Sequence, residues 1–208
     1  MDERPLLEFE GRVVYAASEK DANAACEEIL NAPSQEGQTG PLVCGFDMEW
    51  SVTNSGPGKT ALVQLCASDS DCYLLHLPFC GLPYSLRRLL CAKKIVKVGV
   101  AIENDIWKLC RDFDDIPGAY IVKNSCVELS PYANRVLNSA ESWSLDGLTR
   151  HLLKRRLDKS IDVRLSDWSA EQLTESQQRY AALDAYASYR IYNELKEREK
   201  KKAQKRNG

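Results

Sequence analysis

The sequence predicts one α/β domain in which a mixed β-sheet is flanked by helices on both faces. Strand-like runs come first, strands and helices alternate afterwards, and no linker is long enough to separate two domains. The length of 208 residues agrees with this prediction, because it suits one compact domain. We assign residues 1–195 to the domain and residues 196–208 to a basic C-terminal tail.

The first half of the chain is expected to supply most of the sheet. Strands are predicted at residues 12–15, 42–50, 60–68 and 71–77. Ser18 follows the first strand and is the expected N-cap of a helix, with Asp21 in the capping-box position. Residues 32–41 and 51–59 are rich in turn-forming residues and predict loops. We expect the second loop to form a mobile lip beside Trp50.

The second half of the chain alternates between strands and helices. Strands are predicted at residues 95–101 and, more weakly, 126–129. Helices are predicted at residues 84–92, 104–113 and 131–137, and two more are expected to begin after Ser144 and Thr174. The longest helix follows Thr174, where Gln177 occupies the capping-box position. This alternation is why helices are expected on both faces of the sheet.

The composition is that of a soluble globular protein. Hydrophobic residues make up 44% and charged residues 28% of the chain, which excludes a disordered protein. No apolar run approaches the roughly 20 residues of a membrane-spanning helix, and the N-terminus lacks a signal-peptide pattern. We therefore expect an intracellular protein with no membrane partner.

Cysteine and histidine patterns exclude several chemistries. The chain has eight cysteines but no C-x-x-C pair, and only two histidines, so a zinc site is not expected. We expect the cysteines to be reduced and structural. His76 lies in a predicted strand and His151 in a predicted helix, so both are expected to be structural, and serine–histidine catalysis lacks support.

The charge is distributed unevenly along the chain. Residues 196–208 hold seven Lys or Arg and two Glu, so the tail carries +5 and the other 195 residues carry −7 of the net −2. An acidic body does not favour general nucleic-acid binding. Contact with nucleic acid would need local basic points or cations held by carboxylates.

Two carboxylates share one face of the strand VCGFDMEW. With a period of two, Asp47 and Glu49 point to one side, opposite the apolar face formed by Phe46 and Met48. They would lie within reach of a common ion. The alternative is an ordinary half-exposed strand whose acidic residues face water.

A third carboxylate interrupts an apolar stripe of the last helix. Tyr180, Asp184, Ala187, Ile191 and Leu195 fall on one face of that helix. A carboxylate in a packing stripe is costly unless it is paired or binds a metal. The alternative for Asp184 is a border residue that hydrogen bonds to a neighbour.

Asp105 follows an apolar strand at a strand-to-helix junction, where α/β folds place ligand groups. It could instead be an ordinary first-turn residue whose negative charge interacts favourably with the helix dipole. Together with Asp47, Glu49 and Asp184, it forms a set of oxygen ligands suited to Mg²⁺ or Mn²⁺. Two such ions can clamp the attacking and leaving oxygens of a phosphoryl displacement.

Three motifs carry a family resemblance: FDMEW, VGVAIENDIWKL and YAALDAY. With them, the chain resembles the DEDD-type 3′→5′ exonucleases, which have a ribonuclease H-like fold. Tyr180 matches the tyrosine subtype, because the histidine subtype would need His where Arg179 stands. The stretches ALVQLCAS, WKLCRDF and ESWSLDGL further resemble the Werner-type exonuclease domains. The chain has no room for a helicase, so we expect a stand-alone relative or an excised domain.

The resemblance implies a metal-dependent, two-metal-ion exonuclease that releases nucleoside 5′-monophosphates. It implies catalytic roles for Asp47, Glu49, Asp105, Tyr180 and Asp184, with the four carboxylates binding two Mg²⁺ or Mn²⁺ ions. Tyr180 would orient the attacking water rather than act as a strong base, because an unperturbed phenol has a pKa of about 10.

Seven further residues are candidate nucleic-acid contacts. These are Met48, Trp50, Trp107, Lys154, Arg155, Arg156 and Arg164. The resemblance suggests that the end of the strand bearing Met48 and Trp50 touches the terminal nucleotide, and core packing is the alternative for both tryptophans. The basic cluster Lys154-Arg155-Arg156, with Lys159 and Arg164, would hold phosphates or else form a solvated helix end. The basic tail would be a nuclear localisation signal, a DNA arm or a solvated helix.

The function that follows is 3′→5′ hydrolysis of DNA in repair or replication, in the nucleus. The expected substrate is DNA with an accessible 3′ end (recessed, duplex or single-stranded), and the expected partner protein is a separate RecQ-type helicase. One alternative is a ribonuclease D-like RNA exonuclease. A catalytically silent nucleic-acid-binding module is the other, although a scaffold gains nothing from clustered like charges.

Overall fold

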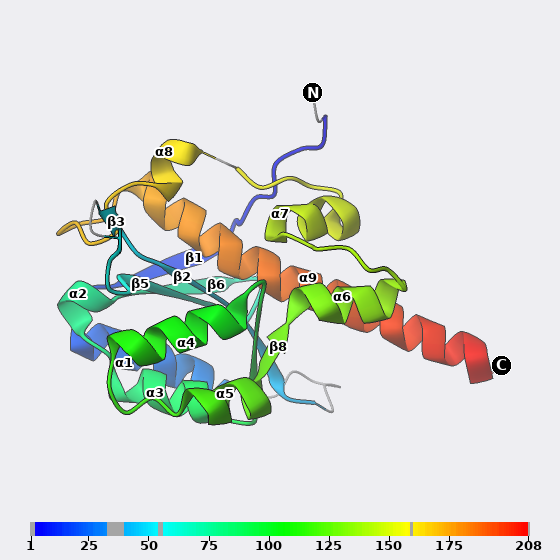
Figure 1. Ribbon diagram of the computed structural model, residues 1–208, viewed down its shortest axis with the longest axis horizontal. Coiled ribbons are helices and arrows are strands. Elements are labelled where there is room, and N and C mark those ends of the chain that lie inside the picture. The colour runs from blue at the N-terminus through cyan, green and yellow to red at the C-terminus, as the bar shows by residue number, and fades with distance from the viewer. Residues whose placement is uncertain (1–2, 33–39, 54–55, 159, 208) are drawn as a thin grey trace.

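A computed structural model describes residues 3–32, 40–53, 56–158 and 160–207. Its main sheet has six strands in the order β1-β6-β5-β2-β7-β8, with helices on both faces (Figure 1). These strands are β1 (Arg12–Ala16), β2 (Leu42–Glu49), β5 (Leu62–Cys66), β6 (Asp71–His76), β7 (Ile95–Gly99) and β8 (Cys126–Glu128). The predicted mixed α/β sheet is therefore confirmed.

The sheet is mixed because β5, one of its two central strands, runs antiparallel to both neighbours. β5 pairs antiparallel with both β2 and β6, whereas β1 pairs parallel with β6. β7 pairs parallel with β2, and β8 with β7. β2 thus lies inside the sheet, with partners on both edges.

Two layers of helices enclose the sheet. One layer consists of α1 (Glu19–Leu30), α2 (Leu77–Cys80), α3 (Tyr84–Cys91), α4 (Ile102–Asp112) and α5 (Gly118–Ser125). The other consists of α6 (Leu129–Leu137), α7 (Leu145–Leu148), a π-helical turn (Thr149–Leu153), α8 (Ile161–Arg164) and α9 (Glu175–Asn207). Figure 1 shows α9 crossing one face of the sheet, with α4, α3 and α1 on the other. Each face therefore has its own apolar core.

The predicted helix caps are present. The backbone N–H of Asp21 donates to the hydroxyl of Ser18 at 3.1 Å, and that of Gly147 to Ser144 at 3.1 Å. Thr174 and Gln177 form a full capping box: each backbone N–H donates to the other side chain, at 2.9 and 3.2 Å. These bonds fix where α1, α7 and α9 begin.

The alternative of a half-exposed β2 is wrong. Cys44, Phe46 and Met48 are buried under α1, α3 and α4, as predicted, but the opposite face is covered too. There α9 packs over Val43 and Gly45, both buried. Asp47 and Glu49 therefore lie at the edge of a packed interface rather than on an open surface.

Some elements differ from the prediction. Helices α2, α5 and α8 were not expected, and the loop predicted at 51–59 contains a short antiparallel pair, β3 (Val52–Thr53) and β4 (Gly56–Pro57). Most of the loop predicted at 32–41 lies outside the described residues. The proposed tail continues α9 through residue 207.

Cysteines and histidines have structural surroundings. All eight cysteines are free thiols. His76 is buried, and its ring nitrogens contact the Tyr15 hydroxyl and, at 3.0 Å, the backbone carbonyl of Trp168. The ring of His151 packs against Trp143 with centroids 5.1 Å apart. Across the described residues, no helix combines the length and apolar character needed to cross a bilayer.

Candidate active site

Three carboxylates meet where α9 crosses β2. Asp47 and Glu49 come from the end of β2, and Asp184 comes from the third turn of α9. One carboxylate oxygen from each lies within 4.8 Å of the others. The residues that sequence reasoning placed on separate elements thus form one group.

Burial and mutual repulsion keep this group from ionising easily. Desolvation raises the pKa of Asp47 to about 6. Desolvation, followed by the charges of Asp47 and Asp184, raises the pKa of Glu49 to about 9. The pKa of Asp184 is also raised well above its ordinary value, again mainly by burial. The site therefore holds protons that a cation would displace.

Asp105 lies beside the three carboxylates in the first turn of α4, and its side chain is 8% exposed. Burial, then the charges of Asp47 and Glu128, raises its pKa to about 8. Glu128, at the end of β8, accepts a 2.8 Å hydrogen bond from the backbone N–H of Ala101, the left-handed N-cap of α4. Glu128 thereby fixes the start of the helix that carries Asp105.

Tyr180 points toward the same carboxylates. Tyr180 lies one turn before Asp184 on α9 and lowers the pKa of that carboxyl relative to what burial alone would give. The indole of Trp168, fully buried, packs against the Tyr180 ring with centroids 6.1 Å apart. Burial and then the neighbouring carboxylates raise the pKa of Tyr180, so the phenol stays protonated and can donate a hydrogen bond.

The donor set fits a hard divalent cation. Three carboxylate oxygens within 4.8 Å of one another match the oxygen-only preference of Mg²⁺ and Mn²⁺. Like charges close together are unfavourable without a cation, and this repulsion adds to the desolvation that raises the pKa values of Glu49 and Asp105. Asp47, Glu49 and Asp184 would hold such an ion.

Of the predicted basic contacts, Arg164 lies nearest the carboxylates. Its positive charge lowers the pKa values of Glu49, Asp184 and Tyr180 relative to what burial alone would give. Arg164 ends α8 and is exposed, and its backbone carbonyl accepts a 3.2 Å hydrogen bond from the Trp168 indole. Its guanidinium is therefore available at the mouth of the site.

The other basic residues lie elsewhere. Arg156 is pinned to the N-terminal segment: its Nε donates to the carbonyl of Arg4 at 3.0 Å, and its backbone N–H to Pro5 at 3.0 Å. Lys154 donates to the carbonyl of His151, and Arg155 borders a groove on the far side of that segment. These contacts give Arg156 a structural role. Lys159 lies outside the described residues.

The predicted aromatic and apolar contacts differ in how far their side chains are exposed to solvent. The side chain of Met48 is 3% exposed and belongs to the core beneath the sheet, which does not support a side-chain contact with nucleic acid. Trp50 is half-buried, and the ammonium of Lys108 lies 4.9 Å from its ring centroid. Trp107 is 41% exposed on α4 and remains free to contact a ligand.

The lip after Trp50 is anchored at both ends. The Ser51 hydroxyl donates to Asp167 at 2.7 Å, which ties the lip to the loop before α9. The Lys108 ammonium donates to the carbonyl of Gly58 at 2.7 Å, which ties it to α4. Its tip, residues 54–55, lies outside the described residues.

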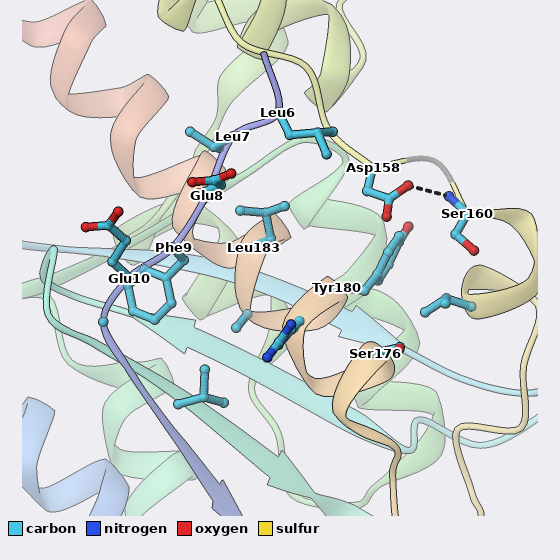
Figure 2. Close-up of a pocket in the computed structure, with 15 residues that line it drawn as sticks. Leu6, Leu7, Glu8, Phe9, Glu10, Asp158, Ser160, Ser176, Tyr180 and Leu183 are labelled. Carbon is cyan, nitrogen blue, oxygen red and sulfur yellow. Dashed lines mark hydrogen bonds between the residues drawn. The ribbon is translucent and has the colours of Figure 1, made fainter.

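A groove of about 740 Å³ lies next to Tyr180, between the N-terminal segment and α9 (Figure 2). Its walls include Leu6, Phe9 and Leu183, and its polar lining includes three acidic residues and one cation. Those four are Glu8, Glu10, Asp158 and Arg179. The net negative lining does not favour a phosphate backbone, so this groove is not the expected path of a nucleic acid.

Sequence reasoning missed three residues that support the site. Glu128 holds the start of α4, Trp168 packs against Tyr180, and Lys108 joins the lip to α4. Lys108 had a sequence signal, since it belongs to the motif VGVAIENDIWKL, and Trp168 lies twelve residues before Tyr180 of the third motif. The supporting roles of all three depend on contacts between separate segments of the chain.

The mixed sheet and the carboxylate group agree with the exonuclease fold and site that the sequence motifs predict. The chain matches the family model described as 3'-5' exonuclease over residues 13–199. Because this match covers most of the chain, the protein belongs to the 3′–5′ exonuclease family, and it is a hydrolase of that class.

Two relatives illustrate the similarity. The bifunctional 3'-5' exonuclease/ATP-dependent helicase WRN of Mus musculus is 44% identical over 198 residues, which are 93% of this chain and 13% of that protein. The 3'-5' exonuclease of Drosophila melanogaster is 36% identical over 201 residues, 95% of this chain and 56% of that protein. The chain thus spans only part of the length of both.

Solved structures share the fold. The Nibbler EXO domain of Aedes aegypti matches with a TM-score of 0.76 and 22% identity, covering 93% of this chain and 91% of that one. Escherichia coli RNase D matches with a TM-score of 0.72 and 20% identity, covering 90% of this chain and 45% of that one. At these identities the similarity is one of fold.

Proposed function

We propose that this exonuclease removes nucleotides from the 3′ ends of DNA and releases nucleoside 5′-monophosphates. The observation that carries the proposal is the group formed by Asp47, Glu49 and Asp184, with Tyr180 one turn from Asp184 on α9. Carboxylates gathered at this spacing serve cation-assisted phosphoryl transfer, and a binding module would have no use for their repulsion.

The carboxylates prepare the site for two divalent cations. When bound, such ions stabilise charge on the scissile phosphate and lower the pKa of the attacking water. Asp47, Glu49 and Asp184 would hold one ion, and Asp105 would support the other. Glu128 keeps Asp105 in place through the N-cap of α4.

Tyr180 and Arg164 would position the attacking water and the phosphates of the substrate. The protonated Tyr180 hydroxyl, held against Asp184 and Trp168, can orient a water or a phosphate oxygen by donating a hydrogen bond. The exposed guanidinium of Arg164 can pair with a phosphate next to the scissile one. Ile161 and Leu165 flank Arg164 and are 68% and 66% exposed, so a base has an apolar surface to rest on.

The resemblance to Werner-type exonuclease domains implies DNA as the substrate. Identity is 44% to a mouse protein whose name joins the exonuclease to a helicase, and 20% to RNase D, whose title names an exoribonuclease in structured RNA processing. The first value supports the Werner-type resemblance, and the second shows only a shared fold. By the same argument we propose a helicase as a partner and a role in nuclear DNA repair or replication.

RNA is the second candidate, because the fold neighbours include RNase D. The deciding experiment uses 5′-labelled DNA and RNA of the same sequence with recessed 3′ ends. Each is incubated with Mn²⁺, Mg²⁺ or EDTA, with wild-type protein and with Asp47→Ala. A cation-dependent ladder that shortens from the 3′ end of DNA, and is lost in the variant, is expected.

Each other outcome has a definite meaning. Faster degradation of RNA than of DNA would replace the DNA proposal with the RNA one. Degradation that persists in EDTA or in Asp47→Ala would contradict the assigned site. Absence of any ladder, with binding of DNA retained, would establish the silent binding module instead.

A further inference from the structure

A buried glutamine lies next to the carboxylate group without hydrogen-bond partners. Gln64, in the middle of β5, is 0% exposed. Neither its Nε2 nor its Oε1 has a partner among the described residues of the chain. A buried amide with both polar atoms unpaired is unusual in a folded protein and calls for an explanation.

The register of the sheet explains what Gln64 faces. In the antiparallel pairing of β2 and β5, Gln64 lies directly opposite Asp47. Directly opposite side chains share a face, with Cβ atoms about 5 Å apart, and Glu49 is the diagonal neighbour. The same face is covered by α9, which brings Asp184. The amide is therefore enclosed with two of the three carboxylates on its own sheet face.

Packing alone does not account for an amide here. Apart from the carboxylates, the neighbours of Gln64 on this face are apolar: Leu62 and Cys66 on the same strand, and Leu74 opposite it on β6. A leucine would fill such a position without leaving polar atoms unpaired. The site carboxylates are the nearby groups that gain from an N–H donor.

We propose that Gln64 is a positioning residue of the active site, whose amide N–H donates a hydrogen bond to the Asp47 carboxylate when that carboxylate binds a cation. The proposal rests on the function proposed above. Gln64 would supply this donor from the neighbouring strand, directly opposite Asp47. That bond would fix which oxygen of Asp47 faces the cation.

The experiment compares cation affinity with stability in Gln64→Leu. Mn²⁺ is titrated calorimetrically into the wild-type and variant proteins, and the melting temperature is measured without metal. We expect Mn²⁺ affinity to fall about 10–100-fold, as when groups that hydrogen bond to metal ligands are removed. The metal-free melting temperature should stay the same or rise, because an unpaired buried amide is replaced by a side chain of similar size. Exonuclease activity should recover at high Mn²⁺.

Gln177→Leu is the matched control. Gln177 is a buried glutamine whose amide does have partners, in the α9 capping box and on Ser166. Its replacement should lower the melting temperature and leave Mn²⁺ affinity unchanged. Gln64→Met provides a second, more adaptable replacement should Gln64→Leu fail to fold.

Three results would overturn the inference. The first is unchanged Mn²⁺ affinity in a folded Gln64 variant. The second is an equal loss of affinity in Gln177→Leu, which would show a general effect of core mutation. The third is a wild-type protein that binds no Mn²⁺, which would overturn the cation-dependent function as well. A wild type that binds Mn²⁺ and degrades DNA, with unaffected Gln64 variants, would reject the inference alone.

Discussion

Gly45 of β2 touches the backbone of α9 at Ala185. A Cβ atom on Gly45 would lie 2.0 Å from the carbonyl oxygen of Ala185 and 2.9 Å from the backbone nitrogen of Tyr189. Only glycine allows the helix this close to the strand. Because Asp184 precedes Ala185 and Asp47 follows two residues after Gly45, this contact sets the spacing of the carboxylates.

Gly45→Ala should therefore damage both stability and activity. The added methyl must push α9 away from β2, and overpacking of this kind costs about 1–3 kcal/mol of unfolding free energy. The melting temperature should fall, and activity should be lost even well below it, because Asp184 moves with the helix. Gly40→Ala is the control, since no atom lies within 4 Å of its added Cβ. Equal effects of the two substitutions would contradict this account.

Much of the fold follows from local sequence signals, and the exceptions are instructive. The strand patterns and the caps at Ser18 and Thr174 were sufficient to predict their elements. Helix α5 was missed because GAYIVKNS is composed largely of weak helix formers, and packing of Ile121 into the core stabilises it instead. The burial of both faces of β2 was also missed, because it depends on where α9 packs.

Metal-free stability should fall as the pH rises. The pKa values of Asp47, Asp105 and Glu49 are raised to about 6, 8 and 9 in the folded protein, above those of an unfolded chain. The folded state therefore binds more protons than the unfolded state over this range. The contribution of these groups to the free energy of unfolding is lost as the pH rises through these values.

Thermal melting between about pH 5 and pH 9, with and without Mn²⁺, checks this prediction. The cation displaces these protons, so the stabilisation by Mn²⁺ should grow toward high pH. Asp47→Asn should raise the metal-free melting temperature at the alkaline end and reduce the response to Mn²⁺. A metal-free melting temperature that rises steadily with pH would show that other groups dominate.

Tyr180→Phe should reduce activity less than Asp47→Ala. The raised pKa of Tyr180 excludes a role as a base near neutral pH, so the hydroxyl contributes by orientation. Loss of a supporting hydrogen bond costs about 10–100-fold, whereas removal of Asp47 takes away a ligand of the proposed cation site. Single-turnover rates on a recessed 3′ end give the comparison. Complete loss in both variants would assign Tyr180 a larger role.

The site was predictable to the extent that its residues lie in short motifs. FDMEW and YAALDAY place four of the five candidate catalytic residues, and Asp105 follows from a strand-to-helix junction. Glu128 and Gln64 could not be predicted, because each becomes significant only through a neighbour on another strand or helix. The structural contact of Arg156 could not be predicted either, because Arg156 is adjacent to Arg155 in sequence but hydrogen bonds with the N-terminal segment.

Arg164 should be the basic residue that matters most for substrate binding. Its charge lowers the pKa values of Glu49, Asp184 and Tyr180, whereas the Lys154 ammonium donates a hydrogen bond to the backbone carbonyl of His151. Arg164→Ala should raise KM and reduce the slope of log affinity against log salt by about one, as expected for one lost phosphate contact. Lys154→Ala should change neither quantity.

Arg156→Ala completes the comparison, since its contacts predict the opposite behaviour. Loss of the bonds from Arg156 to the N-terminal segment should lower the melting temperature and leave the salt slope unchanged. DNA binding measured by fluorescence anisotropy over a range of salt concentrations separates the two effects. If Arg156→Ala changed the salt slope and Arg164→Ala did not, the path of the nucleic acid would run along the N-terminal segment rather than past α8.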